Sequence, residues 1–471
     1  MAATEVVFAY PRPSRLVETT GAPTMVDLST LAPWVGGAPA FFDGWLPRPR
    51  QAATLLLTVA AIARSRYFLR ISPLLLDPIL TSGDDRLRLE AFSSCCGVYA
   101  RADLLPDGLR QVTVGNGTTN VDCNPALRAA LALVDDSTPT RLTVGTGGIE
   151  VATPDGISFE RRVKLPRRWI KGLGEAGLAQ VDMQPCFQVG APAARRFLAA
   201  IPPEGAASAP EYVVAQRGRD LVFTRRGVAG MPWVAGPFRL RELRPLAHFA
   251  TTLRVWARPG GGPGPSAWEL ELPGARFWLV LSPSVYRGFS GEGQALEALA
   301  DEELVAEAVA LRARLDGVSP PGGRDGGEPL AGPRPGWRAR LDEAEIAALA
   351  GFGVDRARDL LAVLGSQGLV GRDLAEDGWF RRDLPFSAEL IPLLQPRVRR
   401  AAEITSADLS ARRLPGGAVE VFVRSGDIEH RVLLDGDGAS CTCLWYVRHA
   451  GSRGPCRHII AARRLKPRPA P

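Results

Sequence analysis

The sequence predicts an α+β protein of several domains, with a strand-rich N-terminal region and a small separate domain at the C-terminal end. Three observations lead to this fold class. The 471 residues exceed one ordinary domain, so about two to four domains are expected. The 50 glycines and 40 prolines favour turns and short elements over long helices. Three of the seven cysteines and two of the four histidines are concentrated in residues 441–464.

Residues 1–317 form the predicted N-terminal region, of one or two lobes. Apolar periodicity predicts helices, and alternation between glycine-containing turns predicts strands. Helices are expected at 51–69, 124–135, 192–201 and 292–315, the last with Ser290 and Gly291 at its start. Strand sets are expected at 141–165, 211–227 and 251–283. The adjacent Cys95 and Cys96 are expected to be buried in an apolar strand.

Residues 318–336 are predicted to be a linker, because eleven of these nineteen positions are glycine or proline. Residues 337–395 then read as a winged-helix-like segment. Two short helices are expected at 341–349 and 353–365, followed by a ribbon formed by LVGRDL and GWFRRDL. The charges on its candidate recognition helix cancel, so DNA contact and simple packing both stay open.

The excess of positive charge is confined to residues 396–471, the predicted C-terminal domain with a basic tail. These residues hold 14 basic and 7 acidic side chains, while the other 395 hold 43 of each. A basic surface of this kind attracts phosphate backbones. Arginine-biased drift in composition at a chain end is the alternative explanation. The candidate nucleic-acid contacts are Arg448, Arg453, Arg457, Arg463, Arg464 and Lys466. Of these, Arg453, Arg457, Arg463 and Arg464 are expected to lie together on one exposed face beside the metal.

The cysteine and histidine spacing in this domain is C-x-C-x12-C-x-H. Cys441 and Cys443 follow a predicted β-hairpin, and residues two apart in an extended chain point to one face. Cys456 and His458 would diverge by about 200° within a helix, so Cys456 must precede the helix or lie in its first turn. Pro455 is typical of such a helix start.

Three thiolates and one imidazole complete a tetrahedral Zn2+ site with no position left for water. We therefore expect one structural zinc ion, bound by Cys441, Cys443, Cys456 and His458. His449, beside the loop AGSRGP, is the rival ligand.

These residues resemble the SWIM zinc finger, in which C-x-C after a hairpin precedes C-x-H at a short helix. The match covers about residues 415–465, and the resemblance implies the same four ligands and binding to DNA or proteins. The whole chain resembles bacterial SWIM-finger proteins in SSCCGVYARADLLP, GTTNVDCNP and LGSQGLVGRDLAEDGWFRRDLPF. Those proteins accompany AAA ATPases and von Willebrand A proteins, which implies protein partners of these types. No catalytic residue carries over.

The predicted function is a cytoplasmic, non-enzymatic zinc-binding adaptor. No run of 18 apolar residues predicts a membrane span, and the first residues lack the pattern of a signal peptide. No assembled nucleophile, base and acid is recognisable, and no small-molecule substrate is indicated. The alternative is an enzyme of unknown type in residues 1–317, with the zinc finger as its targeting module.

Overall fold

The computed structural model describes residues 15–17, 25–27, 40–68, 78–121, 123, 125–145, 148–153, 156–161, 167–204, 211–226, 231–260, 262–315, 339–382, 395–436 and 438–464. The predicted linker at 318–336 and Lys466 lie outside these ranges. Helices and strands are mixed along the chain, which confirms the predicted α+β class. Among the described helices, none combines the length and the apolar character needed to cross a bilayer.

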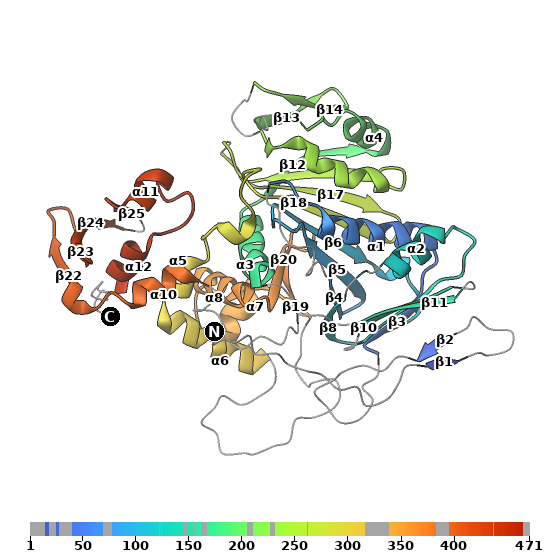
Figure 1. The fold of residues 1–471 in the computed structure, drawn as a ribbon, viewed down its shortest axis with the longest axis horizontal. Helices are drawn as coiled ribbons and strands as arrows, with labels where there is room; N and C mark the ends of the chain where they lie inside the picture. Colours follow the sequence, from blue (N-terminus) through green and yellow to red (C-terminus); the bar gives the residue numbers. More distant parts are fainter. Residues whose placement is uncertain are drawn as a thin grey trace, which may run out of the picture.

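The centre of the molecule is an eight-stranded sheet with the order β12–β16–β17–β18–β6–β5–β4–β8 (Figure 1). Its strands are β4 (Ile79–Gly83), β5 (Arg86–Phe92), β6 (Val98–Leu104), β8 (Gly117–Asn120), β12 (Gln184–Gly190), β16 (Thr252–Ala257), β17 (Ser266–Leu272) and β18 (Ala275–Leu281). The strands predicted at 251–283 are therefore confirmed. The helix α1 (Pro49–Arg64), predicted at 51–69, packs on β5 and β6.

Two smaller sheets flank this centre. One has the order β11–β10–β9–β3–β7 and comprises β3 (Phe42–Trp45), β7 (Arg110–Val114), β9 (Arg141–Gly145), β10 (Gly148–Thr153) and β11 (Gly156–Arg161). The other comprises β13 (Glu211–Arg217), β14 (Asp220–Thr224) and β15 (Trp233–Ala235). The predicted helices near them form as α2 (Pro125–Leu133) and α4 (Ala191–Ala199). A separate pair joins β1 (Arg15–Val17) to β2 (Met25–Asp27), and the 3-10 helix η2 (Pro237–Leu246) follows β15. A further short 3-10 helix is η1 (Pro106–Gly108).

Cys95 and Cys96 are buried, but the prediction that they belong to a strand is wrong. They lie in the turn between β5 and β6, where Cys96 has a φ of 56°. The carbonyl oxygen of Cys96 accepts a hydrogen bond from the amide of Phe289 at 2.8 Å. This turn therefore supports the short 3-10 helix η3 (Phe289–Gly291).

The helix predicted at 292–315 is divided into α5 (Leu296–Ala300) and α6 (Glu302–Leu315). Asp301 breaks it, because its carboxylate accepts the amide of Leu304 at 3.0 Å and begins a new helix. Ser290 and Gly291 belong to η3 instead of starting α5.

The winged-helix-like segment forms in the predicted order. It comprises β19 (Arg340–Leu341), α7 (Glu343–Ala350), α8 (Val354–Ser366), β20 (Val370–Asp373) and β21 (Gly378–Arg381). All residues of β20 and β21 are buried, and α8 packs on α6 and on α3 (Arg167–Val181), a helix the sequence did not predict. The ribbon therefore faces protein, whereas the first turn of α8 keeps Val354 and Asp355 exposed. DNA contact by this segment stays a prediction.

Buried ion pairs attach the ribbon β20–β21 to the central sheet. Arg382, directly after β21, makes a bidentate contact with Glu90 of β5, at 2.6 and 2.5 Å. Arg101 of β6 donates to Asp373 at 3.0 Å. These side chains have lost their water and depend on one another for charge compensation.

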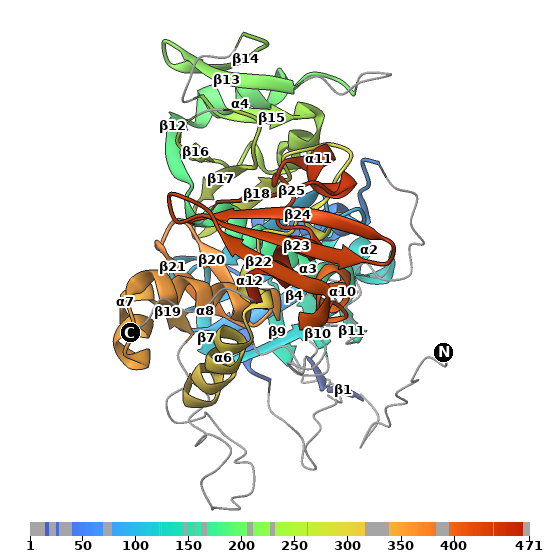
Figure 2. The same ribbon diagram turned by 90° about the vertical axis from the view of Figure 1, so that its left-hand side faces the viewer.

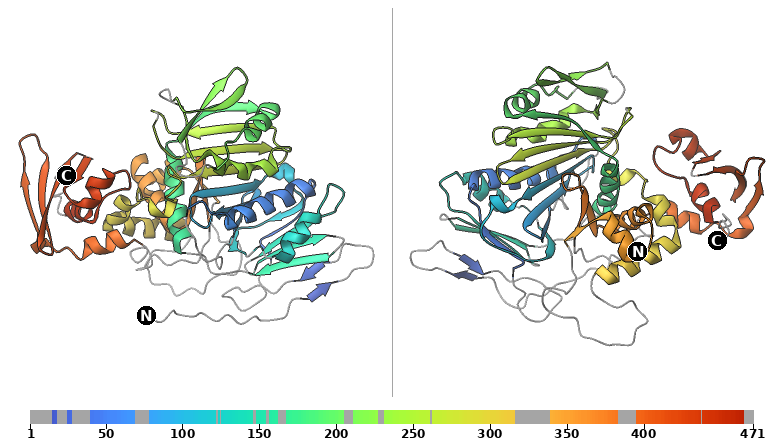
Figure 3. Two further views of the ribbon diagram at one scale, coloured as in Figure 1. Left: turned by 45° about the horizontal axis from the view of Figure 1, so that its top comes forward. Right: turned by 180° about the vertical axis from the view of Figure 1, so that it is seen from behind.

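The C-terminal domain projects from one end of the molecule, and its sheet faces the viewer in Figure 2. Its sheet has the order β22–β23–β24–β25, with β22 (Leu409–Arg413), β23 (Val419–Ser425), β24 (Ile428–Asp435) and β25 (Gly438–Cys441). The remaining elements are α10 (Pro396–Ala402), η4 (Ser406–Asp408), α11 (Leu444–His449) and α12 (Arg457–Arg464). Figure 3 shows α10 between this domain and the body, and α10 contacts both α5 and α12.

Candidate metal centre

The four predicted zinc ligands meet in the C-terminal domain. Cys441, Cys443, Cys456 and His458 are all buried, and their ligand atoms lie within 4.8 Å of one another. Residues from three elements contribute. Cys441 ends β25, Cys443 caps α11, and Cys456 precedes α12, which contains His458 near its start. The predicted position of Cys456 before the helix is confirmed.

Backbone amides already stabilise sulfur in this cluster. The amide of Cys443 donates to Cys441 Sγ and the amide of Tyr446 donates to Cys443 Sγ, each at 3.4 Å. The helix α11, which the sequence did not predict, turns the chain after Cys443 and so presents the amide of Tyr446. Hydrogen bonds from amides favour the charged form of a thiol, which is the form that binds metal.

The three thiols do not have equal proton affinity. Hydrogen bonds, first from Cys441 and then from His458, lower the pKa of Cys456 to about 4. The pKa of Cys441 is raised, first because its thiol is hydrogen-bonded to Cys456. Burial raises the pKa of Cys443. Cys456 is therefore the thiolate of the cluster, and the protons that remain on its neighbours are held in hydrogen bonds to it. A divalent cation would displace those protons on binding. The donor set fits Zn2+.

The histidines have different roles. His458 directs Nδ1 toward the cluster, 3.8 Å from Cys441 Sγ, and its Nε2 lies 3.2 Å from Arg457 Nε. The rival ligand His449 lies outside the cluster, with its ring 4.5 Å from that of Trp445 and its Nε2 3.5 Å from Arg453. The ring of His430 lies against that of His458, with centroids 4.2 Å apart and planes tilted by 35°.

Arg453 attaches the finger to the body, although the sequence suggested that it would share an open face with other arginines. Its guanidinium donates to the carbonyl oxygen of Gly291 at 3.3 and 2.9 Å. Arg397 of α10, which the sequence did not single out, donates to the carbonyl oxygens of Arg453 and Pro455 at 2.6 and 3.0 Å. Both guanidinium groups lie over the ring of Trp445, with Cζ of Arg453 and of Arg397 at 4.6 and 4.7 Å from the ring centroid. No local pattern marks Arg397, because its hydrogen-bond partners lie more than 50 residues away.

The other candidate arginines differ in exposure. Arg448 and Arg464 are exposed, and Arg463 is half-buried. Arg457 is also half-buried and donates to Ser425 Oγ at 2.7 Å. Nucleic-acid contact by these residues stays a prediction.

Glycines allow the finger and the body to approach closely. Gly454 has a φ of 71°, and a Cβ at this position would lie 1.8 Å from the carbonyl oxygen of Gly293. No side chain fits there without moving backbone. The loop before Cys456 therefore packs directly on the segment after η3.

Comparison with known proteins identifies the finger. A family model described as SWIM zinc finger matches residues 430–462. No curated protein matches the chain. Among solved structures, Proliferating Cellular Nuclear Antigen from Entamoeba histolytica is similar at 9% identity, covering 52% of this chain and 98% of its own, with a TM-score of 0.35.

A second structure, the C-terminal region of FEN-1 bound to A. fulgidus PCNA, is similar at 12% identity. It covers 51% of this chain and 97% of its own, with a TM-score of 0.34. The local evidence is decisive: residues 430–462 are a SWIM zinc finger, with Cys441, Cys443, Cys456 and His458 placed to hold one structural Zn2+.

Proposed function

We propose that the chain is a non-enzymatic, zinc-dependent adaptor whose SWIM finger binds nucleic acid while the rest of the molecule docks partner proteins. The observation that carries the nucleic-acid part is the confinement of all excess positive charge to the segment that contains the finger. Within it, Arg448 and Arg464 are exposed beside the metal centre. Phosphate backbones are the common polyanions that such a surface attracts.

The zinc ion has a structural role in this proposal. Four protein ligands fill a tetrahedral shell, so no coordination position stays open for water or substrate. The ligands come from β25, the start of α11 and the start of α12, and the ion would fix these elements relative to one another. The orientation of the arginines on α11 and α12 thus depends on the metal.

Protein partners form the second part of the proposal. The likeness to bacterial SWIM-finger proteins suggests an AAA ATPase and a von Willebrand A protein as the other members of a multiprotein system. Co-purification of the full chain with such proteins from its source cells is the direct test of this part.

The enzyme alternative requires a cleft that gathers carboxylates with arginine or cysteine. One such cleft, of about 710 Å3, is lined by Asp84, Arg340, Asp342 and Glu345. Asp342 accepts the amides of Ala344 and Glu345 as a helix cap, and Arg340 pairs with Glu376 at 3.6 Å. The described lining of this cleft contains no cysteine, serine, histidine or lysine. This cleft does gather carboxylates with an arginine, but Arg340, Asp342 and Glu345 lie outside residues 1–317. The enzyme therefore stays the alternative to the adaptor.

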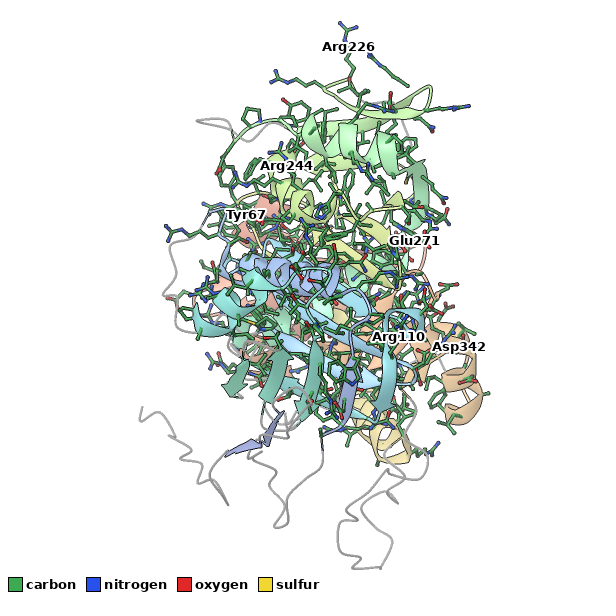
Figure 4. The ribbon with its side chains drawn as sticks, turned by 90° about the vertical axis from the view of Figure 1, so that its right-hand side faces the viewer. Tyr67, Arg110, Arg226, Arg244, Glu271 and Asp342 are labelled. Carbon is green, nitrogen blue, oxygen red and sulfur yellow. The ribbon has the colours of Figure 1, made fainter. Side chains whose placement is uncertain are left out.

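The test of nucleic-acid binding is a titration of duplex and single-stranded oligonucleotides with the zinc-loaded full chain, at about 50 to 200 mM salt. Replacing Arg448 and Arg464 with alanine is expected to weaken binding and to reduce the salt slope by about two. The control replaces Arg110 and Arg226, which Figure 4 shows on the side turned away from the finger. Absence of binding at low salt, or an equal effect of the control, would refute this part of the proposal.

A further inference from the structure

A cleft of about 650 Å3 separates the finger from the body. The body wall includes Trp233 of β15, Arg258 directly after β16, and Arg287 and Gln294 on either side of η3. The finger wall includes Tyr446 of α11 and Arg463 of α12. Clefts of this size between domains are common ligand sites.

Positive charge predominates in this cleft. Three arginines line it, and the acidic residue among its described lining, Glu292, is buried and paired with Arg287 at 2.5 Å. Arg397 lies next to this lining, since it donates to the carbonyl oxygens of Glu292 and Pro455 at 3.2 and 3.0 Å. Burial, and then repulsion from Arg453, lowers the pKa of Arg397 to about 10. These crowded cations would gain from the entry of an anion.

Aromatic rings stand on both walls. Trp233 and Tyr446 are half-buried, so part of each side chain stays accessible from the cleft. The hydroxyl of Tyr446 donates to the carbonyl oxygen of Ala439 at 2.8 Å, which fixes the position of its ring. Arginines that follow a phosphate backbone, together with rings on which bases stack, are the usual components of sites for single-stranded nucleic acid.

We propose that the cleft between finger and body binds a short single-stranded segment of nucleic acid. Arg258 and Arg463 contact its phosphates, and Trp233 and Tyr446 stack on its bases. A duplex keeps its bases paired and stacked on one another, so it offers these rings no free base. The inference rests on the proposed nucleic-acid function and adds the class of substrate and a contribution from the body.

The experiment compares binding of a single-stranded oligonucleotide and a duplex by the zinc-loaded full chain, using fluorescence anisotropy. Two variants alter only the body wall, Trp233→Leu and Arg258→Gln. Trp233→Leu is expected to weaken single-strand binding about tenfold, because a stacking ring is lost. Arg258→Gln is expected to reduce the single-strand salt slope by about 0.7. Neither should change duplex binding.

Matched controls are Phe352→Leu, at an exposed aromatic residue outside the cleft, and Arg226→Gln, shortly after β14 and also outside the cleft. If the wild-type chain binds neither oligonucleotide, the proposed function itself fails. If it binds nucleic acid and the body-wall variants behave like the controls, the inference is overturned and the proposed function stands. If poly-glutamate binds in the cleft and no oligonucleotide does, the occupant is an acidic protein segment and the inference is wrong.

Discussion

The contact between Gly454 and Gly293 makes a sharp prediction about how the finger is held. A Cβ on Gly454 would lie 1.8 Å from the carbonyl oxygen and 2.5 Å from the carbonyl carbon of Gly293. Both atoms are backbone, so no side-chain rotation relieves the clash. Gly454→Ala should therefore force the loop before Cys456 away from the body.

The expected magnitude has two parts. Alanine in a left-handed conformation costs about 1 kcal/mol. Overpacking against backbone adds about 1–3 kcal/mol. Gly451→Ala is a matched control, since Gly451 also has a positive φ, of 79°, but its added Cβ meets its nearest atom, in Tyr446, at 4.0 Å. Gly451→Ala should therefore cost only the conformational term of about 1 kcal/mol.

Hydrogen exchange of the full, zinc-loaded chain measures this difference locally. Gly454→Ala is expected to raise exchange at residues 289–295 and 449–456 well above that of Gly451→Ala, with zinc content unchanged in both. Equal exchange in the two variants would refute the close packing of finger on body.

Two further predictions concern buried charge. Arg382→Met should destabilise the fold by about 3–5 kcal/mol in urea unfolding, because it removes the bidentate partner of the buried Glu90, and adding Glu90→Gln should recover much of the loss. Burial alone would raise the pKa of Glu90, but Arg382 holds it below its ordinary value, so this pair's stabilisation is lost as the pH falls. Glu175 is expected to give the opposite pH dependence. Burial raises its pKa to about 7, so the free energy of unfolding should fall by roughly 3 kcal/mol as the pH rises from about 4.5 to 7. Glu175→Gln should flatten that slope; an unchanged slope would contradict the burial of this carboxyl.

Local sequence signals predicted the metal centre well. The spacing of Cys441 and Cys443, and the helix start at Pro455, act over a few residues, and geometry within such a span is nearly fixed. Alternating apolar residues likewise predicted β13, β14 and β16–β18. These elements depend mainly on their own sequence.

Elements shaped by distant contacts were missed. The helix α3 contains Gly172, Gly174 and Gly177, which disfavour a helix locally. Tertiary packing requires two of them, because a Cβ on Gly174 would lie 2.5 Å from Ser366 Cα and one on Gly172 would lie 3.0 Å from the ring of Phe92. The helix α11 was missed because its apolar residues do not mark a buried face. Leu444 and Val447 are 73% and 67% exposed, so the short helix has no amphipathic pattern.

Long-range polar pairing was also beyond sequence reasoning. Glu90 and Arg382 are 292 positions apart, and Arg453 meets Gly291 across 162. Nothing in a single sequence relates such residues. The prediction that Arg453 lies on an open face failed for this reason, since a charged residue near the chain end gives no sign of a carbonyl partner in the body.

The most direct test of the central claim is the zinc content of the purified full chain, measured by mass spectrometry for the wild type, Cys456→Ser and Cys186→Ser. Cys186 is half-buried and lies outside the metal cluster, so it controls for the loss of a thiol. We expect one zinc ion per chain in the wild type and in Cys186→Ser, and loss of zinc with rapid amide exchange across residues 430–462 in Cys456→Ser. A wild-type chain that contains no zinc, yet protects these amides from exchange, would contradict the account.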